Sequence, residues 1–185
     1  VEIKGERTLA PSCCRSATAG MEVQANSERA VKSQKMVLEM LLSDMPDTGY
    51  KWSETDESQQ HGELSEWAAR MDVTVRPELK ALRREQPRTD VSHPAMAVNL
   101  DACIQCNRCV RACREEQVND VIGYALRGAD SKIVFDLDDP MATSTCVACG
   151  ECVQACPTGA LMAATLVDEN NVYKGKPDRT VDSVC

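Results

Sequence analysis

Residues 103–113 read CIQCNRCVRAC and residues 146–157 read CVACGECVQACP, so eight of the eleven cysteines fall into two runs with the same spacing. In each run three cysteines stand at two-residue gaps and a fourth follows three residues later. Three cysteines at such gaps can wrap around one corner of an iron–sulfur cube. The fourth begins a helical turn and points away, so it reaches the other cube. The spacing therefore predicts two [4Fe–4S] clusters.

The exchanged fourth cysteine defines two predicted ligand sets. The first cluster is expected to use Cys103, Cys106, Cys109 and Cys156. The second is expected to use Cys146, Cys149, Cys152 and Cys113. Pro157 completes the pattern of bacterial two-cluster ferredoxins. We therefore expect an α+β, ferredoxin-like domain over residues 94–167.

Two other uses of cysteine are weighed against this one. Zinc ribbons also contain CxxC pairs, but they use two pairs with a long gap, not triplets. A disulfide framework needs a secreted chain, and no signal peptide is visible. The spacing favours iron–sulfur cubes over both.

The composition agrees with a small electron-transfer domain that bound iron–sulfur clusters stabilise. The chain has 185 residues and only 3% aromatic side chains, so the cysteine-rich segment cannot build a large aromatic core. Iron would supply the missing stabilisation, and we expect residues 94–167 to lose their fold without it. The net charge of −8 argues against a nucleic-acid partner. No apolar run is long enough to span a membrane, and iron–sulfur cysteines without an export signal indicate the cytoplasm.

Two segments precede the cysteine runs. Residues 1–23 read as the end of a β domain, with strands expected at both ends. Residues 24–93 read as a helical connecting region followed by a linker. Ser27 is expected to cap a helix whose apolar face is formed by Ala30, Val37, Leu38, Leu41 and Leu42. Residues 47–60 are expected to form an exposed loop, a second amphipathic helix to begin near Gly62, and residues 77–94 to form a surface linker.

Within residues 94–167 we expect a strand at 97–100, a helix at 107–116, and two added strands at 121–126 and 133–137. Gly150 and Gly159 can let the backbone come close to a cube. The side chains between the ligands are expected to form an apolar wall that keeps water off the sulfurs. They are Ile104, Val110, Val147 and Val153. Such a wall helps to tune a potential within a range of roughly −700 to +450 mV.

The whole chain resembles the N-terminal iron–sulfur region of the α subunit of cytoplasmic NAD-dependent molybdenum (or tungsten) formate dehydrogenases. The resemblance is carried by VEIKGERTLAPSC at 1–13, GMEVQANSERAVKSQKMVLEMLL at 20–42, HPAMAVNLDACIQCNRCVRACREEQVNDVIGYA at 93–125 and STCVACGECVQACPTGAL at 144–161. The first two stretches are shared with the large peripheral-arm subunit of complex I and with hydrogenases. The resemblance implies oxidation of formate to carbon dioxide with reduction of NAD.

Further expectations follow from the resemblance alone. Residues 1–23 would be the C-terminal part of a plant-type [2Fe–2S] β-grasp domain, with Cys13 as its fourth ligand and Cys14 as a neighbour without a role. Residues 168–185 would link to a molybdopterin domain, and Cys185 would be the first ligand of a further [4Fe–4S] cluster. Flavin mononucleotide would sit in an NAD-reducing partner subunit, beside a small [2Fe–2S] subunit. No residue of this chain would be catalytic. The chain ends themselves give one more expectation: Val1 is not an initiator methionine and lies inside an expected strand, and Val181 to Cys185 begin a new segment, so we expect both ends to be cuts through a longer polypeptide.

One departure from the family is clear. Many relatives carry a His-plus-three-Cys cluster before the ferredoxin unit, but here no cysteine occurs from Arg15 through Ala102. That cluster is therefore expected to be absent, with His61 a surface residue and His93 a turn residue.

Three arginines near the first cluster, Arg108, Arg111 and Arg114, leave two interpretations open. They form a solvated helix face, or their charge raises a cluster potential or docks an acidic partner. In the second case Arg108→Ala would lower a midpoint potential. Two other functions also stay open: a stand-alone ferredoxin-like carrier and the electron-input domain of a hydrogenase.

Overall fold

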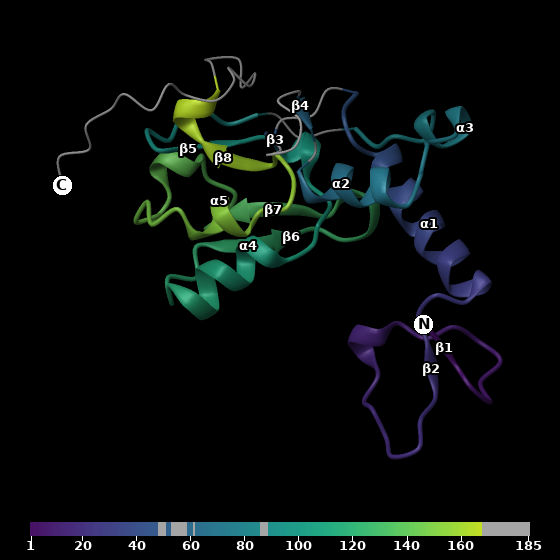
Figure 1. The fold of residues 1–185 in the computed structure, drawn as a ribbon. Coiled ribbons are helices and arrows are strands. Elements are labelled where there is room, and N and C mark those ends of the chain that lie inside the picture. Colours follow the sequence, from purple (N-terminus) through teal and green to yellow (C-terminus); the bar gives the residue numbers. More distant parts are fainter. Residues whose placement is uncertain (48–50, 53–58, 61, 86–88, 168–185) are drawn as a thin grey trace.

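A computed structural model describes residues 1–47, 51–52, 59–60, 62–85 and 89–167. Strand β5 (Met96–Val98) pairs antiparallel with β8 (Leu161–Ala163), with Val98 opposite Leu161. Both strands are mostly buried and contribute Met96, Val98 and Leu161 to the core of the cysteine-rich domain. This pairing joins the segment before the first cysteine run to the segment after the second. It therefore closes the domain around both runs (Figure 1).

The remaining elements of this domain lie between β5 and β8 in sequence. Helix α4 (Arg108–Arg111) continues into a π-helical turn (Ala112–Glu116), and α5 (Glu151–Ala155) follows the second run. Strands β6 (Ile122–Ala125) and β7 (Lys132–Phe135) form an antiparallel hairpin. The predicted helix and the two added strands are thus confirmed. The hairpin packs Ile122, Ile133 and Phe135 into the core that also holds Val110 and Met141.

The N-terminal segment forms a small separate unit. Strand β1 (Glu2–Ile3) pairs antiparallel with β2 (Val23–Gln24), which confirms the two short strands expected there. The long helix α1 (Glu28–Ser43) follows, and the Ser27 hydroxyl accepts a hydrogen bond from the Ala30 N–H at 3.3 Å. Figure 1 shows the β1–β2 unit at one end of α1, on the side away from the cysteine-rich domain.

The other end of α1 packs against the cysteine-rich domain. Leu38, Leu41 and Leu42 contact its core, as the apolar pattern predicted. Val37 was expected to share this apolar face, and that prediction is wrong: its side chain is 55% exposed, whereas Leu38 beside it packs against the core.

The connecting region contains more regular structure than expected. Strands β3 (Lys51–Trp52) and β4 (Gln59–Gln60) pair antiparallel within the stretch predicted as a loop. Helix α2 (Glu63–Arg70) begins after Gly62, as predicted, and buries Leu64 and Ala68. A short helix α3 (Pro77–Lys80) opens the linker. In the part of the chain that the structure covers, no helix combines the length and the apolar character needed to cross a bilayer.

Candidate iron–sulfur centres

The first cysteine run surrounds a cavity together with one residue of the second run. Cys103, Cys106, Cys109 and Cys156 all line it. The rest of its wall is largely apolar and comes from several elements: Leu100, Ile104, Ile133, Pro157, Ala160 and Leu161. These four cysteines are the first predicted ligand set, including the exchanged fourth member. Four thiols around an apolar cavity fit the donor set of a [4Fe–4S] cube.

The second predicted set also lies together. Burial raises the pKa of the Cys152 thiol to about 12, and the neighbouring charges that add to this effect are Cys146, Cys149 and Cys113. Burial likewise raises the pKa of Cys103 to about 11, and there the contributing thiols are Cys156 and Cys106. Each thiol group therefore contains the fourth cysteine of the other run. The structure brings both predicted sets together, and their binding of iron stays a prediction.

The two groups are spread around a volume rather than gathered at a point. Among the described residues, no three His, Cys, Asp or Glu side chains converge closely enough to hold one metal ion. A cubane has its irons at separate corners, each held by one thiolate, so its ligands stand around a cavity.

The two cysteine loops share one backbone conformation. Gln105 and Ala148, each two residues after the first cysteine of its run, have φ of 56° and 58°. Asn107 and Gly150, two residues further on, have φ of 67° and 82° and precede α4 and α5. Gly150 tolerates this left-handed conformation without a steric cost. The close approach to a cube that was predicted for Gly150 stays a prediction.

Backbone N–H groups in both loops point at sulfur. Gln105 N–H donates to Cys103 Sγ at 3.4 Å, and Ala148 N–H donates to Cys146 Sγ at the same distance. Val121 N–H donates to Cys113 Sγ at 3.4 Å. Cys113 lies in the π-helical turn after α4, a kind of turn that is frequent at functional sites. Hydrogen bonds to cluster sulfurs are one of the factors that set a reduction potential.

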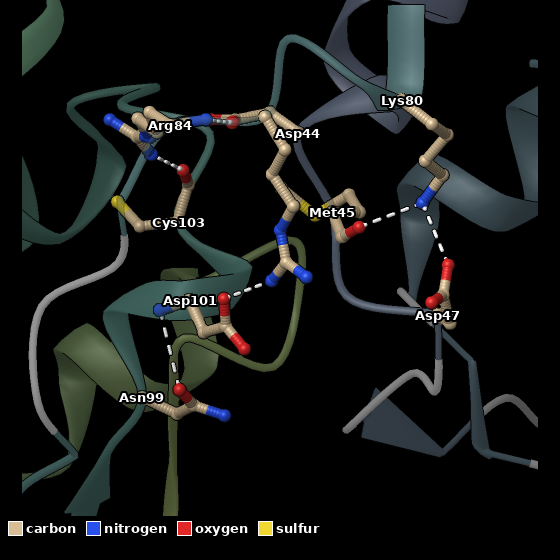
Figure 2. A network of polar contacts seen from close by, with 9 residues as sticks. Asp44, Met45, Asp47, Lys80, Arg84, Asn99, Asp101 and Cys103 are labelled. Carbon is tan, nitrogen blue, oxygen red and sulfur yellow. Dashed lines mark hydrogen bonds and ion pairs between the residues drawn. The ribbon is translucent and has the colours of Figure 1, made fainter. Parts of the chain in front are cut away.

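The first loop is held by residues that sequence reasoning missed. Arg84 Nη2 donates to the Cys103 carbonyl at 2.8 Å, as Figure 2 shows. The Tyr124 hydroxyl donates to the Gln105 carbonyl at 2.9 Å, and the Gln105 side chain donates to the Ser131 carbonyl at 2.6 Å. The only signal for Arg84 was a pair of arginines in a charged linker, which does not reveal the contact.

The predicted apolar wall is correct for three of its four members. Val110 is buried, and Ile104 and Val153 pack against the core. Val147 is 63% exposed, so its place in the wall was predicted wrongly. It is the counterpart of Ile104 in the second run. Ile104 lies in a pocket with Met40 and Leu41 of α1 and with the turn of the hairpin, so its loop is the one that other elements cover.

The three arginines of the first run are all paired within the chain. Arg108 binds both carboxylate oxygens of Glu63 at 2.7 and 3.0 Å. Arg111 pairs with Glu115 at 2.9 Å, and Arg114 with Asp120 at 2.7 Å. Glu63 itself donates its backbone N–H to the Pro157 carbonyl at 3.0 Å, beside the first cavity. The Arg108 charge is therefore close to the first centre but already balanced by a carboxylate.

The remaining candidate residues are distributed as follows. Cys13 and Cys14 are exposed on a 3-10 turn (Ser12–Cys14), with their sulfurs 3.6 Å apart. His93 is a buried turn residue whose Nδ1 accepts the Ala95 N–H at 3.1 Å, so the expected turn is confirmed. His61 and Cys185 lie outside the described residues.

Comparison with known proteins supports the cysteine pattern. Residues 102–160 match the family described as 4Fe-4S dicluster domain. The chain is 33% identical over 98% of its length to NADP-reducing hydrogenase subunit HndD of Solidesulfovibrio fructosivorans, and 30% identical over 88% to an NADH-quinone oxidoreductase subunit of Rhizobium meliloti. It covers 30% and 18% of those two proteins. A putative formate dehydrogenase of Staphylococcus haemolyticus is 32% identical over 40% of the chain, which covers 7% of that protein.

A solved structure shares the fold over most of the chain. It is the crystal structure of an NAD+-reducing [NiFe]-hydrogenase in the H2-reduced state, with a TM-score of 0.67 at 25% identity. The match covers 83% of this chain and 63% of the hydrogenase chain. The chain therefore carries an iron–sulfur 4Fe-4S dicluster domain for electron transfer, and it is similar to hydrogenase subunit HndD, to an NADH-quinone oxidoreductase subunit and to formate dehydrogenase-like proteins.

Proposed function

We propose that residues 94–167 relay electrons between two [4Fe–4S] clusters inside an NAD-linked oxidoreductase. Cys103, Cys106, Cys109 and Cys156 would hold the first cluster, and Cys146, Cys149, Cys152 and Cys113 the second. The observation that carries this proposal is the cavity in which Cys156 joins the three cysteines of the first run. Such interleaving ties both clusters into one folded unit. The clusters supply one-electron chemistry, and the chain supplies thiolates, N–H donors and an apolar enclosure.

We propose formate dehydrogenase as the whole enzyme. Under this hypothesis, electrons from formate would pass from a molybdopterin centre beyond residue 185 into this domain. They then reach a [2Fe–2S] cluster with Cys13 as one ligand, and finally a flavin subunit that reduces NAD. Residues 1–23 would end the [2Fe–2S] domain, residues 24–93 would connect, and residues 168–185 would lead to the catalytic domain. A cytoplasmic enzyme with a small [2Fe–2S] subunit is part of the same proposal.

A hydrogenase is the second candidate, and one observation favours it. The hydrogenase subunit HndD aligns with 98% of the chain, whereas the putative formate dehydrogenase aligns with 40%. The two candidates share this domain and differ in what lies beyond residue 185. The dicluster domain therefore cannot distinguish a formate dehydrogenase from a hydrogenase. The substrate that the full-length protein oxidises can.

The test is to determine the coding sequence on both sides of this segment and to assay the full-length protein anaerobically. A CxxCxxxC beginning at Cys185, with formate-dependent reduction of NAD, supports formate dehydrogenase. Hydrogen-dependent reduction of NAD supports the hydrogenase instead. If dithionite reduces the clusters but the protein oxidises neither formate nor hydrogen, the result supports a stand-alone electron carrier. A protein that binds no iron–sulfur cluster contradicts the proposal altogether.

A further inference from the structure

One ion pair joins three segments of the chain next to the first cysteine run. Arg84 Nε lies 2.5 Å from Asp44 Oδ2, and the backbone N–H of Arg84 donates to Asp44 Oδ1 at 3.2 Å. The same guanidinium donates through Nη2 to the Cys103 carbonyl at 2.8 Å (Figure 2). The Arg84 side chain is 21% exposed and that of Asp44 is 29% exposed, so both charges are largely withdrawn from water.

Neighbouring contacts hold the pair in place. Asp44 caps the end of α1, and Cys103 is the first cysteine of its run. Arg83 pairs with Asp101, and Lys80 Nζ donates to the Met45 carbonyl at 2.9 Å and to Asp47 at 3.1 Å. Residues 80–84 are thus fastened both to the end of α1 and to the segment that enters the first cysteine loop. A cation held this way has little freedom to move away from Cys103.

The second cysteine run is held at its entry by other groups. There Cys146 N–H donates to the Ser144 hydroxyl at 3.4 Å, and Thr145 bonds to the Asp136 carboxylate through its N–H at 2.6 Å and its hydroxyl at 3.0 Å. The groups that hold this entry are thus a hydroxyl and an anion. The two loops share a backbone conformation, but among the contacts described here a guanidinium bonds to the first cysteine only in the first loop.

A fixed charge at this distance acts on a redox equilibrium. A reduced cluster carries one more negative charge than an oxidised one, so a nearby cation stabilises the reduced form and a nearby anion destabilises it. Partial burial weakens screening by water and salt.

We propose that Arg84 and Asp44 form a charge pair that sets the midpoint potential of the first cluster relative to the second. Arg84 raises this potential and Asp44 lowers it, and both act through position rather than as iron ligands. The inference rests on the proposed function, because it requires Cys103 to bind a cluster. It adds two positioning residues that lie outside both cysteine runs.

The test is a redox titration of the full chain, purified anaerobically with its clusters and followed by electron paramagnetic resonance. Arg84→Gln removes the cation and leaves Asp44 unbalanced, so the first cluster becomes harder to reduce. Asp44→Asn leaves Arg84 unbalanced, so it becomes easier to reduce. We expect opposite shifts, each near a tenfold change in the ratio of reduced to oxidised cluster at fixed potential, or about 59 mV for one electron. Arg84→Lys keeps the charge and should retain part of the potential.

The matched control is Arg76→Gln. Arg76 also pairs with a carboxylate of α1, Glu39, at 2.7 Å, but within the described residues its side chain bonds to Glu39 and not to a cysteine loop. We expect both potentials to stay unchanged in this variant. The first cluster's signal is the one that Cys106→Ser removes.

The outcomes separate the two proposals. Shifts of opposite sign confined to the first cluster support the charge pair. Unchanged potentials, or shifts of the same sign in Arg84→Gln and Asp44→Asn, overturn the charge pair while the two-cluster relay stands. If Arg84→Gln loses the cluster, Asp44→Asn alone decides through the sign of its shift. A wild-type chain without clusters overturns the relay itself, and the charge pair with it.

Discussion

Gln105 and Ala148 occupy equivalent places in the two cysteine loops and adopt the same left-handed backbone conformation, with φ of 56° and 58°. Each donates its N–H to the sulfur of the cysteine two residues earlier, at 3.4 Å. A residue with a Cβ pays roughly 1–2 kcal/mol for this conformation. Both loops therefore hold backbone strain at the place where N–H groups must face sulfur, which is where strained residues commonly cluster.

The strain at Ala148 gives the first prediction. Ala148→Gly should raise the free energy of unfolding by about 0.5 kcal/mol, because the relief of roughly 1–2 kcal/mol exceeds the entropy that glycine adds to the unfolded chain. Ala148→Val should lower it by about 1 kcal/mol or more, since a β-branched residue fits this region poorly. Anaerobic urea unfolding of the cluster-loaded chain measures both changes.

The control for this pair is Ala155→Gly at the end of α5, where the backbone is helical. There glycine should lower stability by up to about 1 kcal/mol. If Ala148→Gly lowers the free energy of unfolding as much as Ala155→Gly does, the left-handed conformation of Ala148 does not cost the second loop stability.

The exchanged fourth cysteines give the second prediction. Cys156→Ser should affect the same cluster as Cys106→Ser, because both residues line one cavity. Cys113→Ser should instead match Cys149→Ser, because both charges act on Cys152. Each variant should bind about four irons where the wild type binds about eight. Iron analysis and electron paramagnetic resonance of the four variants test this grouping. Matching of Cys156→Ser with Cys149→Ser would show that each run holds its own cluster.

A buried threonine gives the third prediction. Thr158 Oγ1 donates to the Ala102 carbonyl at 2.6 Å, and both residues are fully buried. The bond joins the entry of the first run to the exit of the second. Thr158→Val keeps the shape but leaves this carbonyl without its donor, which should cost about 1–3 kcal/mol of unfolding free energy. Thr158→Ser keeps the hydroxyl and should cost less. Equal losses in the two variants would mean that packing, not the hydrogen bond, matters here.

The features that the sequence predicted correctly are those that depend on residues close together in the chain. The cysteine spacing identified both thiol groups, including Cys113 and Cys156, because the loop and the following helical turn fix where each sulfur points. Ser27 marked the start of α1 because capping depends on a few adjacent residues. The start of α2 near Gly62 followed from the apolar spacing of Leu64, Trp67 and Ala68, which is equally local.

The errors and omissions concern contacts between distant segments. Val147 and Ile104 are equivalent in sequence, yet only Ile104 is sheltered, because α1 and the hairpin turn meet the first loop. The contact of Arg84 with Cys103 depends on how the linker returns past the end of α1. Residue spacing and hydrophobic pattern do not show where a linker contacts a distant segment. The charged sequence around Arg84 therefore did not reveal its contact with the first cysteine loop.

Removal of iron gives the last prediction. The cavity walls place several thiols where burial opposes their ionisation, and the domain has little aromatic core to hold these walls apart. We expect residues 94–167 to unfold when the clusters are removed. Circular dichroism and hydrogen exchange of the iron-free chain test this. A cooperative transition with protected amides in residues 94–167 would contradict it.

The titration of the thiols provides an independent readout of the same event. In the folded loops, burial raises the pKa of Cys103 from 9.0 to about 11 and that of Cys152 to about 12. A folded iron-free chain would therefore keep protons that unfolded thiols, with a pKa of about 8.5, have already released. Its free energy of unfolding would fall as the pH rises from about 9 to 11, because the unfolded state then binds fewer protons. We expect the ultraviolet thiolate absorbance of the iron-free chain to titrate as one ordinary group of thiols. A fraction that ionises only near pH 11–12 would show that the loops keep their shape without metal, and that the clusters bind to a preformed site.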